Sequence, residues 1–148
     1  MTVFAVGADH AGFELKNALA AHLRQQGHVV VDLGTNSGDR VDYPDYGAAV
    51  GRAVISGRAD LGLCVCGSGI GIAMAANKVP GVRAATVHDA TSARLARQHN
   101  DANVFCIGGR LVGPQTACDA LDAFVAASFE GGRHEPRVGK INALLNGS

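Results

Sequence analysis

Short apolar runs rich in β-branched residues alternate along the chain with longer amphipathic stretches. This alternation is typical of an α/β fold whose parallel strands lie between two layers of helices. The predicted strands span residues 3–7, 28–33, 61–66, 82–87 and 103–107. Helices are expected over residues 15–26, 46–56, 72–77 and 89–98, and from residue 114 onward. The pattern predicts a three-layer, Rossmann-like α/β/α sandwich with a five-stranded parallel sheet.

The length of 148 residues fits one domain, spanning residues 1–148, that buries a core without disulfides or metal. The tail, from about residue 130 to 148, begins as a Gly-rich loop and is expected to end as a helix. Ile141, Leu144 and Leu145 give that helix an apolar face. This face must pack either on its own domain or on a partner subunit.

Composition narrows the classes of function. An apolar fraction of 47% and a charged fraction of 18% indicate a globular protein, and zero net charge disfavours nucleic-acid or membrane partners. No apolar run reaches the roughly 18 residues that span a bilayer, and the N-terminus lacks a signal-peptide pattern, so we expect a cytoplasmic protein. The four cysteines are expected to stay reduced, and Cys64-Val65-Cys66 lacks the usual zinc spacing, so no structural metal is expected.

Several polar side chains follow directly after predicted strands. Asp9 and His10 follow the first strand, residues 66–71 begin at the end of the third, and Arg110 follows the fifth. In an open α/β sheet, ligands bind beyond the carboxyl ends of the strands, which predicts a site at this edge. His99 and Asn100 instead precede the fifth strand, so simple topology does not place them with the others.

The strongest local motif is the Gly-rich turn Cys66-Gly67-Ser68-Gly69-Ile70-Gly71. Converging backbone N–H groups in such a turn favour an anion, and a cysteine beside them can be present as a thiolate. The alternative is a small buried side chain beside a tight turn, and the local sequence leaves both open. Dinucleotide and P-loop motifs do not fit, because Ile72 or Met74 stands where a glycine is needed and no Gly-Lys-Ser/Thr follows.

The remaining candidates have ordinary structural explanations when taken singly. Asp9 can cap the first helix, and His99 with Asn100 can simply end a later one. Arg133 and Arg137 are four residues apart and can chelate a phosphate dianion if they are helical, but exposed arginines are usually only solvated.

The combination and order of these motifs resemble the ribose-5-phosphate isomerase B family, whose wider group includes galactose-6-phosphate isomerase subunits. The matching stretches are residues 7–13 (GADHAGF), 42–44 (DYP), 66–78, 97–101 (RQHND), and 130–134 (EGGRH) with Arg137. The resemblance implies an aldose–ketose isomerase that interconverts ribose 5-phosphate and ribulose 5-phosphate, a step of the pentose phosphate pathway, through a cis-enediolate. No cofactor and no metal are implied, because an oxyanion hole replaces the Lewis acid.

The same resemblance assigns roles in the chemistry. Cys66 is the base that moves a proton between C2 and C1, and Ser68 assists at the sugar oxygens. His99 opens the furanose ring, with Asp9 binding the ring hydroxyls. Part of the family uses a Glu a few residues after the turn in place of the Cys. Here that position is Ile72, which implies the cysteine-using branch.

Substrate-binding roles follow in the same way. The anion hole is formed by backbone amides of Gly67, Gly69, Ile70 and Gly71. The remaining groups line the sugar pocket (Tyr43, Asn100) or hold the phosphate (His10, Arg110, Arg133, Arg137). The resemblance also implies a homodimer with a shared site, with His99 and Arg110 coming from the partner subunit, and leaves a tetramer open.

Three alternatives remain at the level of sequence. The substrate can instead be a six-carbon aldose phosphate, such as allose 6-phosphate or galactose 6-phosphate. A phospho-sugar-binding module without turnover would keep the Gly-rich turn and the arginines but would not need Cys66 together with His99. One subunit of a heteromeric galactose-6-phosphate isomerase is less favoured, because this chain carries every role itself.

Overall fold

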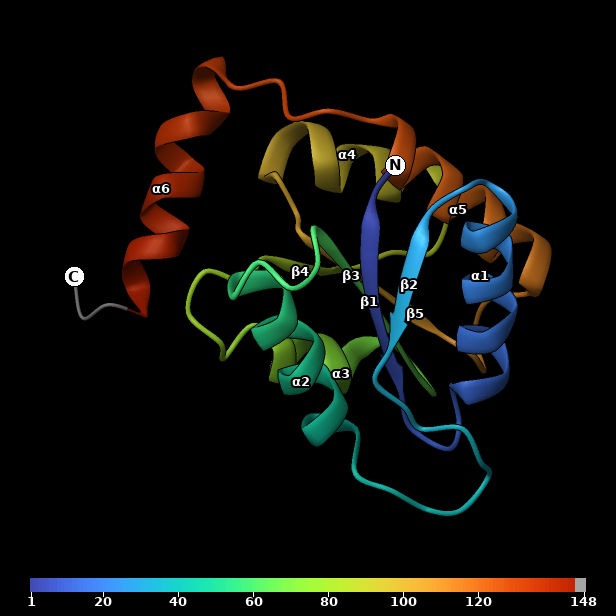
Figure 1. Cartoon of the computed structure of the whole chain (residues 1–148). Helices are drawn as coiled ribbons and strands as arrows, with labels where there is room; N and C mark the ends of the chain where they lie inside the picture. The colour runs from blue at the N-terminus through green and yellow to red at the C-terminus, as the bar shows by residue number, and fades with distance from the viewer. Residues whose placement is uncertain (146–148) are drawn as a thin grey trace.

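The computed structural model describes residues 1–145, so the last three residues of the predicted domain and tail lie outside the described part. Five strands form one sheet in the order β2-β1-β3-β5-β4, and every neighbouring pair is parallel (Figure 1). The strands are β1 (Val3–Ala8), β2 (Val29–Asp32), β3 (Leu61–Cys66), β4 (Ala84–Thr86) and β5 (Val104–Gly108). The predicted α/β sandwich with a five-stranded parallel sheet is confirmed.

Helices cover both faces of this sheet. They are α1 (Phe13–Gln25), α2 (Tyr43–Ile55), α3 (Ile70–Ala76), α4 (Ala90–Asn100), α5 (Pro114–Ala126), the 3-10 turn η1 (Gly132–His134) and α6 (Glu135–Leu144). Successive side chains of a strand point to opposite faces, so each strand contributes to two cores. Phe4 and Val6 of β1 pack with α1, α4 and α5, whereas Ala5 between them packs with α2 and α3.

Most boundaries differ from the sequence prediction by one or two residues, and α2 and β4 differ most. Helix α2 begins at Tyr43, three residues before the predicted start, with Pro44 in its first turn. Proline suits that position because its missing N–H would have no helical partner there. Strand β4 has three residues where six were predicted, because it lies at the sheet edge and pairs only with β5.

Helix α6 stands apart from the helical layers, beside the β4 edge (Figure 1). A groove of about 480 Å³ separates it from the sheet edge and is lined by Ile141 and Leu144 of α6 and by Ala84 and Ala85 of β4. Leu144 is 71% exposed, so the apolar face of the tail helix is only partly covered by its own chain.

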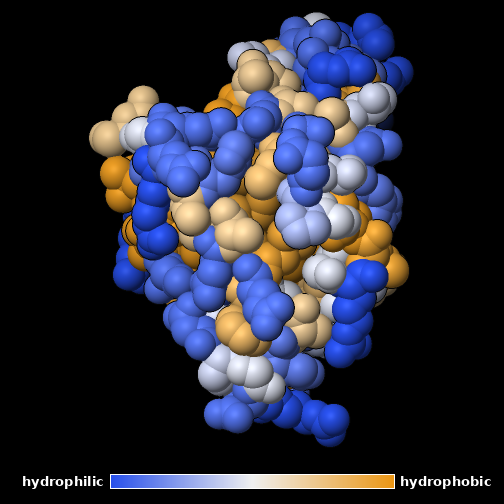
Figure 2. All heavy atoms as spheres, turned by 90° about the vertical axis from the view of Figure 1, so that its right-hand side faces the viewer, coloured by the Kyte–Doolittle hydropathy of each residue, from blue (hydrophilic) through white to orange (hydrophobic). Residues whose placement is uncertain are grey.

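The side of the molecule formed by α1 and α5 is different in character. Polar and charged side chains cover much of this surface, with apolar atoms showing between them (Figure 2). None of the helices within residues 1–145 is both long and apolar enough to cross a membrane.

Candidate active site

A polar pocket of about 380 Å³ lies at the carboxyl ends of β1, β3 and β5, where parallel α/β folds bind their ligands. Its lining contains eight of the residues singled out from the sequence, together with Ala11 and Leu111. The eight are Asp9, His10, Tyr43, Cys66, Gly67, Ser68, Gly71 and Arg110. They come from segments far apart in the sequence, at or next to the carboxyl ends of the strands, and the fold brings them together.

Cys66 is the last residue of β3, and its side chain is almost wholly buried, with 4% of the residue exposed. Its Sγ accepts a hydrogen bond from the backbone N–H of Gly69 at 3.2 Å. Gly69 can point that N–H back at the sulfur because it adopts a left-handed conformation, with φ of 75°. A Cβ at Gly69 would lie 2.6 Å from the carbonyl carbon of Ile107, so the turn also requires a residue without a side chain.

The rest of the turn is held by its own hydrogen bonds. The Oγ of Ser68 accepts from the backbone N–H of Ile70 at 3.2 Å, at the start of α3. Tyr43 lies against Gly71, where a Cβ would come within 2.6 Å of the phenol ring. The amides of Gly69 and Ile70 therefore already donate to side chains of the turn, which a sequence motif does not reveal.

Asp9 and His10 line the pocket from the turn after β1. The Oδ1 atom of Asp9 accepts from the N–H groups of Ala11 and Gly12 at 3.0 and 3.1 Å, so this carboxylate does stabilise the turn before α1. The Nδ1 atom of His10 accepts from the N–H of Val41 at 3.2 Å. That bond places the proton of a neutral His10 ring on Nε2, where it is available to an anionic ligand.

Arg110 belongs to the turn after β5, which is tied directly to the cysteine turn. The N–H of Gly109 donates to the carbonyl of Cys66 at 2.8 Å, and that of Arg110 donates to the carbonyl of Gly67 at 3.0 Å. The side chain of Arg110 lies over Gly67 in the same pocket. The expectation that Arg110 reaches the site from a partner subunit is therefore wrong, because the hydrogen-bonded turns hold it beside its own Cys66.

The other cysteines lie outside the pocket lining. Cys64 and Cys106 are paired residues of neighbouring strands and are fully buried. The contact with Cys64, followed by burial, raises the pKa of the Cys106 thiol well above its usual value. Burial, with Asp122 and Asp119 nearby, raises the pKa of Cys118 as well. These two thiols are kept protonated, which leaves Cys66 as the pocket's candidate nucleophile or base.

Four predicted site residues lie elsewhere: His99, Asn100, Arg133 and Arg137. Helix α4 runs antiparallel to the strands, so its last residues, His99 and Asn100, lie beside the amino ends of the strands. We call this side of the sheet the amino edge, and the opposite side, where the strands end, the carboxyl edge. An 11-residue helix spans roughly 16 Å, which separates them from the pocket. Arg133 lies in η1 and Arg137 in α6, close to the same edge, and both are exposed. Within one chain, these residues do not reach Cys66.

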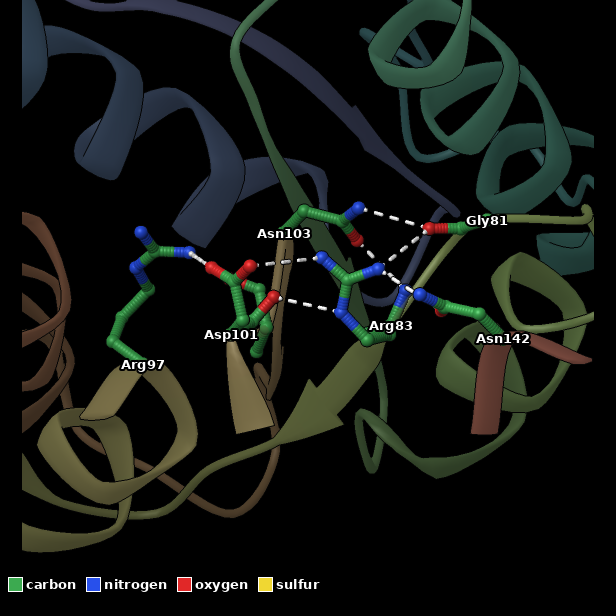
Figure 3. Close-up of polar contacts among 7 residues, drawn as sticks. Gly81, Arg83, Arg97, Asp101, Asn103 and Asn142 are labelled. Carbon is green, nitrogen blue, oxygen red and sulfur yellow. Dashed lines mark hydrogen bonds and ion pairs between the residues drawn. The ribbon is translucent and has the colours of Figure 1, made fainter. Parts of the chain in front are cut away.

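A network of polar contacts fixes the end of α4 (Figure 3). Asp101 ends the helix with φ of 47° and forms ion pairs with Arg97 at 3.1 Å and Arg83 at 3.4 Å. Arg83 also donates to the backbone carbonyls of Asp101 and Gly81 and to the side chain of Asn142 in α6. The network joins the His99 end of α4 to β4 and the tail helix.

Two neighbours of His99 were missed by sequence reasoning. Its ring stacks on the ring of His134, with centroids 4.4 Å apart, and both rings approach the carboxylate of Glu130. Glu130 and His134 are four residues apart, a spacing that hinted at a shared face, but nothing in the sequence indicates that this face meets His99.

Comparison with known proteins gives a consistent result. Residues 4–141 match the model of the Ribose/Galactose Isomerase family. The chain is 47% identical to ribose-5-phosphate isomerase B of Escherichia coli over 97% of each chain. It superposes on the structure of ribose-5-phosphate isomerase B from Clostridium thermocellum with a TM-score of 0.97 and 46% identity, covering 98% of both chains.

A third similar protein was solved with a ligand. This is ribose-5-phosphate isomerase B from Mycoplasma genitalium with bound ribulose 5-phosphate, which matches with a TM-score of 0.93 and 41% identity. The alignment covers 99% of this chain and 97% of that one. The extent of these matches shows that the chain belongs to the ribose/galactose isomerase family.

Proposed function

We propose that this protein interconverts ribose 5-phosphate and ribulose 5-phosphate, with Cys66 as the base of a cis-enediolate mechanism. The observation that carries the proposal is the pocket in which Cys66, the Gly-rich turn, Asp9, His10 and Arg110 converge. Two similar proteins are named for this activity, and a third was solved with ribulose 5-phosphate bound. We further propose that the chain uses the cysteine branch of the family's chemistry, since Ile72 stands where a Glu would serve.

The chemical step needs one base and one anion site. The thiolate of Cys66 removes the proton from C2 of the open-chain aldose, and the C–H electron pair forms the C1–C2 double bond of the enediolate. The π pair of the C1 carbonyl moves onto O1. When the same sulfur returns the proton to C1, the proton of the C2 hydroxyl passes to O1 and the carbonyl is left at C2. Charge on the substrate oxygens is stabilised by the hydroxyl of Ser68 and by amides of residues 67–71 other than those of Gly69 and Ile70, which donate within the turn. The hydrogen bond from the N–H of Gly69 to Sγ supports Cys66 as the base, because a thiolate accepts such a bond well.

Substrate binding is divided between two copies of the chain in this proposal. Asp9 and Tyr43 contact the sugar, while His10 and Arg110 contact the phosphate from the chain that supplies Cys66. The partner subunit supplies His99 for ring opening, with Asn100, Arg133 and Arg137. Helix α4, roughly 16 Å long, carries His99 away from the carboxyl ends of the strands, which supports this division. The partly exposed tail helix supports a partner as well, because an apolar face at an edge is a common feature of subunit interfaces.

We also propose that residues 1–148 act as one sugar-phosphate isomerase domain. Its tail, from about residue 130, contributes two phosphate-binding arginines and packs against the partner. Alternatives in substrate length remain distinguishable by experiment, because five- and six-carbon aldose phosphates differ by one hydroxymethylene group.

The test is an assay of ketose phosphate formation by the purified chain, with each aldose phosphate as substrate in turn. We expect turnover of ribose 5-phosphate to exceed that of allose 6-phosphate and galactose 6-phosphate. We also expect Cys66→Ala to lower kcat at least about a hundredfold, since general acid–base groups typically contribute that much. The matched control is Cys118→Ala, which removes a half-buried thiol outside the pocket and should keep the wild-type rate.

Three outcomes would contradict the proposal. An active Cys66→Ala variant would remove the assigned base. Preference for a six-carbon substrate would reassign the pocket to a longer sugar. Tight binding of ribose 5-phosphate by the wild-type chain without any turnover would indicate a binding module instead.

A further inference from the structure

Two histidines and one carboxylate lie together at the amino edge of the sheet. The Oε1 atom of Glu130 is 3.7 Å from Nε2 of His99 and 3.6 Å from Nε2 of His134. The two rings are stacked with an interplanar angle of 15°, and both Nε2 atoms lie near the same carboxylate oxygen. The three ligand-type atoms all lie within 4.8 Å of one another. We refer to His99, Glu130 and His134 as the amino-edge cluster.

The backbone holds this cluster in place. The N–H of Glu130 donates to the carbonyl of Gln98 at 3.0 Å, which fixes the segment against the end of α4 beside His99. Gly131 and Gly132 then turn the chain with positive φ angles of 65° and 56°, and the N–H of His134 donates to the carbonyl of Gly131. The three side chains therefore converge through defined backbone contacts.

One atom of the cluster lacks a partner. The Nε2 of His134 is buried and makes no hydrogen bond among residues 1–145, and only 7% of this side chain is exposed. Buried polar atoms in native proteins are almost always satisfied, so an unpaired one that points at two other ligand atoms indicates a missing ligand. Burial, together with the charge of Arg133, lowers the pKa of His134. A neutral imidazole is the form that coordinates metal.

We propose that the amino-edge cluster is a binding site for a divalent transition metal of the zinc class, and that the bound metal inhibits the enzyme. Imidazole and carboxylate ligands suit Zn²⁺ and Co²⁺ better than Mg²⁺. Metal–ligand distances of about 2.0–2.1 Å in a tetrahedral zinc site place ligand atoms roughly 3.3 Å apart. The two contacts to Glu130 exceed this by only a few tenths of an ångström. Because the lone pair of an imidazole nitrogen lies in the ring plane, the partly exposed ring of His99 must turn out of the stack to share an ion with His134.

The site is open on one side. The side chains of His99 and Glu130 are 36% and 50% exposed, so a metal can enter and keep a fourth position for water or an anion. Arg133 and Arg137 lie close to His134 and oppose a dication, so the site binds metal less tightly than a closed structural zinc site. Both arginines are exposed, and their charges are screened by solvent.

Inhibition follows from the ligand set and rests on the proposed function. A metal on Nε2 of His99 occupies the lone pair and proton site that ring opening would use. The first effect of metal is then a loss of turnover on the cyclic sugar phosphate. A chelator should reverse that loss, because no bond of the protein is changed.

The first experiment measures binding without relying on activity. The full chain, stripped with a chelator, is titrated with Co²⁺ while visible absorption is recorded. We expect the d–d bands of a low-coordinate cobalt site, one ion per chain, displaced by Zn²⁺ but not by Mg²⁺. His134→Asn and Glu130→Gln should each weaken Co²⁺ binding at least about tenfold. Circular dichroism of each variant checks that it folds.

The matched control uses another histidine–carboxylate contact of the same chain. His22 lies 2.7 Å from Asp122, but among residues 1–145 no third ligand-type side chain completes a metal-binding group with them, so His22→Gln should leave the cobalt spectrum unchanged. Unaltered binding in both cluster variants would overturn the site. A strong near-ultraviolet band from a thiolate–cobalt bond would also overturn it, because that band would place the ion on a cysteine.

The second experiment tests inhibition. Zn²⁺ should lower the wild-type rate, and a chelator should restore it. His134→Asn, measured against its own metal-free rate, should resist Zn²⁺ concentrations that inhibit the wild type. Cobalt binding at the cluster with unchanged turnover would overturn the inhibitory half alone. If the metal-free chain lacks isomerase activity, the proposed function fails, while the cobalt spectrum still decides the metal site.

Discussion

The two edges of the sheet are built in different ways. At the carboxyl edge, backbone hydrogen bonds tie the turns after β3 and β5 to each other, and the side chains of Cys66 and Ser68 accept from amides of their own turn. At the amino edge, long side chains also join the elements, as in the network around Arg83 and Asp101. The first edge is held together by backbone hydrogen bonds, whereas the second leaves ligand atoms of His99, Glu130 and His134 without close partners.

This difference suggests that the two edges have different roles in binding and catalysis. A rigid pocket suits a base and an anion hole, which must hold atoms in place through the transition state. An edge with exposed cations and an unpaired imidazole suits groups that approach a ligand from outside. Neither edge contains a complete set of groups for opening a furanose ring and isomerising the sugar. The two edges are complementary in chemistry, and we expect a second copy of the chain to unite them.

The largest expected effect comes from a complementation experiment, which tests whether two subunits share one active site. Cys66→Ala disables one edge and His99→Asn disables the other, so each variant alone should lose at least about a hundredfold in turnover of cyclic ribose 5-phosphate. Subunits of the two variants, mixed and allowed to exchange, should form heterodimers with one intact site out of two. With random exchange, activity should recover to about a quarter of the wild-type value.

The control for this experiment is the double variant. A chain carrying both substitutions, mixed with either single variant, cannot assemble an intact site and should stay inactive. Failure of the two single variants to regain activity, after subunit exchange has been verified, would contradict a shared site.

The sequence was a good guide to the carboxyl edge for a physical reason. A parallel α/β sheet brings every βα turn to one edge, so locating the strands is enough to bring Asp9, Cys66 and Arg110 together. Both ends of β3 were predicted correctly, because an unbroken apolar run bounded by Asp60 and Gly67 leaves little choice of boundary. The fold class followed from the same alternation of strands and helices.

The amino edge was beyond such reasoning. The contact between His99 and Glu130 depends on how α5 returns the chain to the end of α4, which no local pattern encodes. Arg110 illustrates the opposite error: its position after β5 predicted the pocket, but the resemblance to a family suggested a partner subunit. The shortened β4 also escaped prediction, because propensity does not reveal which strand lies at the edge.

A smaller effect is expected on the free energy of unfolding, and it compares how tightly the two edges are packed around a glycine. Gly69→Ala forces a side chain into a left-handed residue and to within 2.6 Å of backbone atoms of Ile107. We expect it to lower the free energy of unfolding by about 2–4 kcal/mol. The matched variant at the amino edge is Gly132→Ala, where φ is 56° but nothing lies within 4 Å of a new Cβ. It should cost only about 1 kcal/mol.

Urea unfolding of both variants measures the difference directly. A larger loss for Gly69→Ala would show that the cysteine turn is held by close packing as well as by conformation. Equal losses would contradict that distinction, since strain from the positive φ alone would then explain both.

The smallest expected effect concerns a short histidine–carboxylate contact at the amino edge, which differs from the longer contacts of the amino-edge cluster. His22 and Gln26 at the end of α1 bind the carboxylate of Asp122 in α5 at 2.7 and 2.8 Å. Burial raises the pKa of Asp122, but these hydrogen bonds outweigh burial and lower it overall. A lowered folded-state pKa means that the stabilisation is complete above the unfolded value of about 3.9 and is lost as pH falls through the folded value.

Asp122→Asn should therefore cost about 0.5 kcal/mol near pH 7, a small figure because this carboxylate is 44% exposed and screened by solvent. The difference from wild type should shrink as pH falls below about 4, because the wild-type carboxyl then takes up its proton. Thermal unfolding at several pH values measures this trend. A difference that stays constant from pH 7 to pH 3 would mean that packing, not charge, joins α1 to α5. The short His22–Asp122 contact would then make stability depend on pH. The amino-edge cluster differs, because its longer contacts leave room for a metal ion.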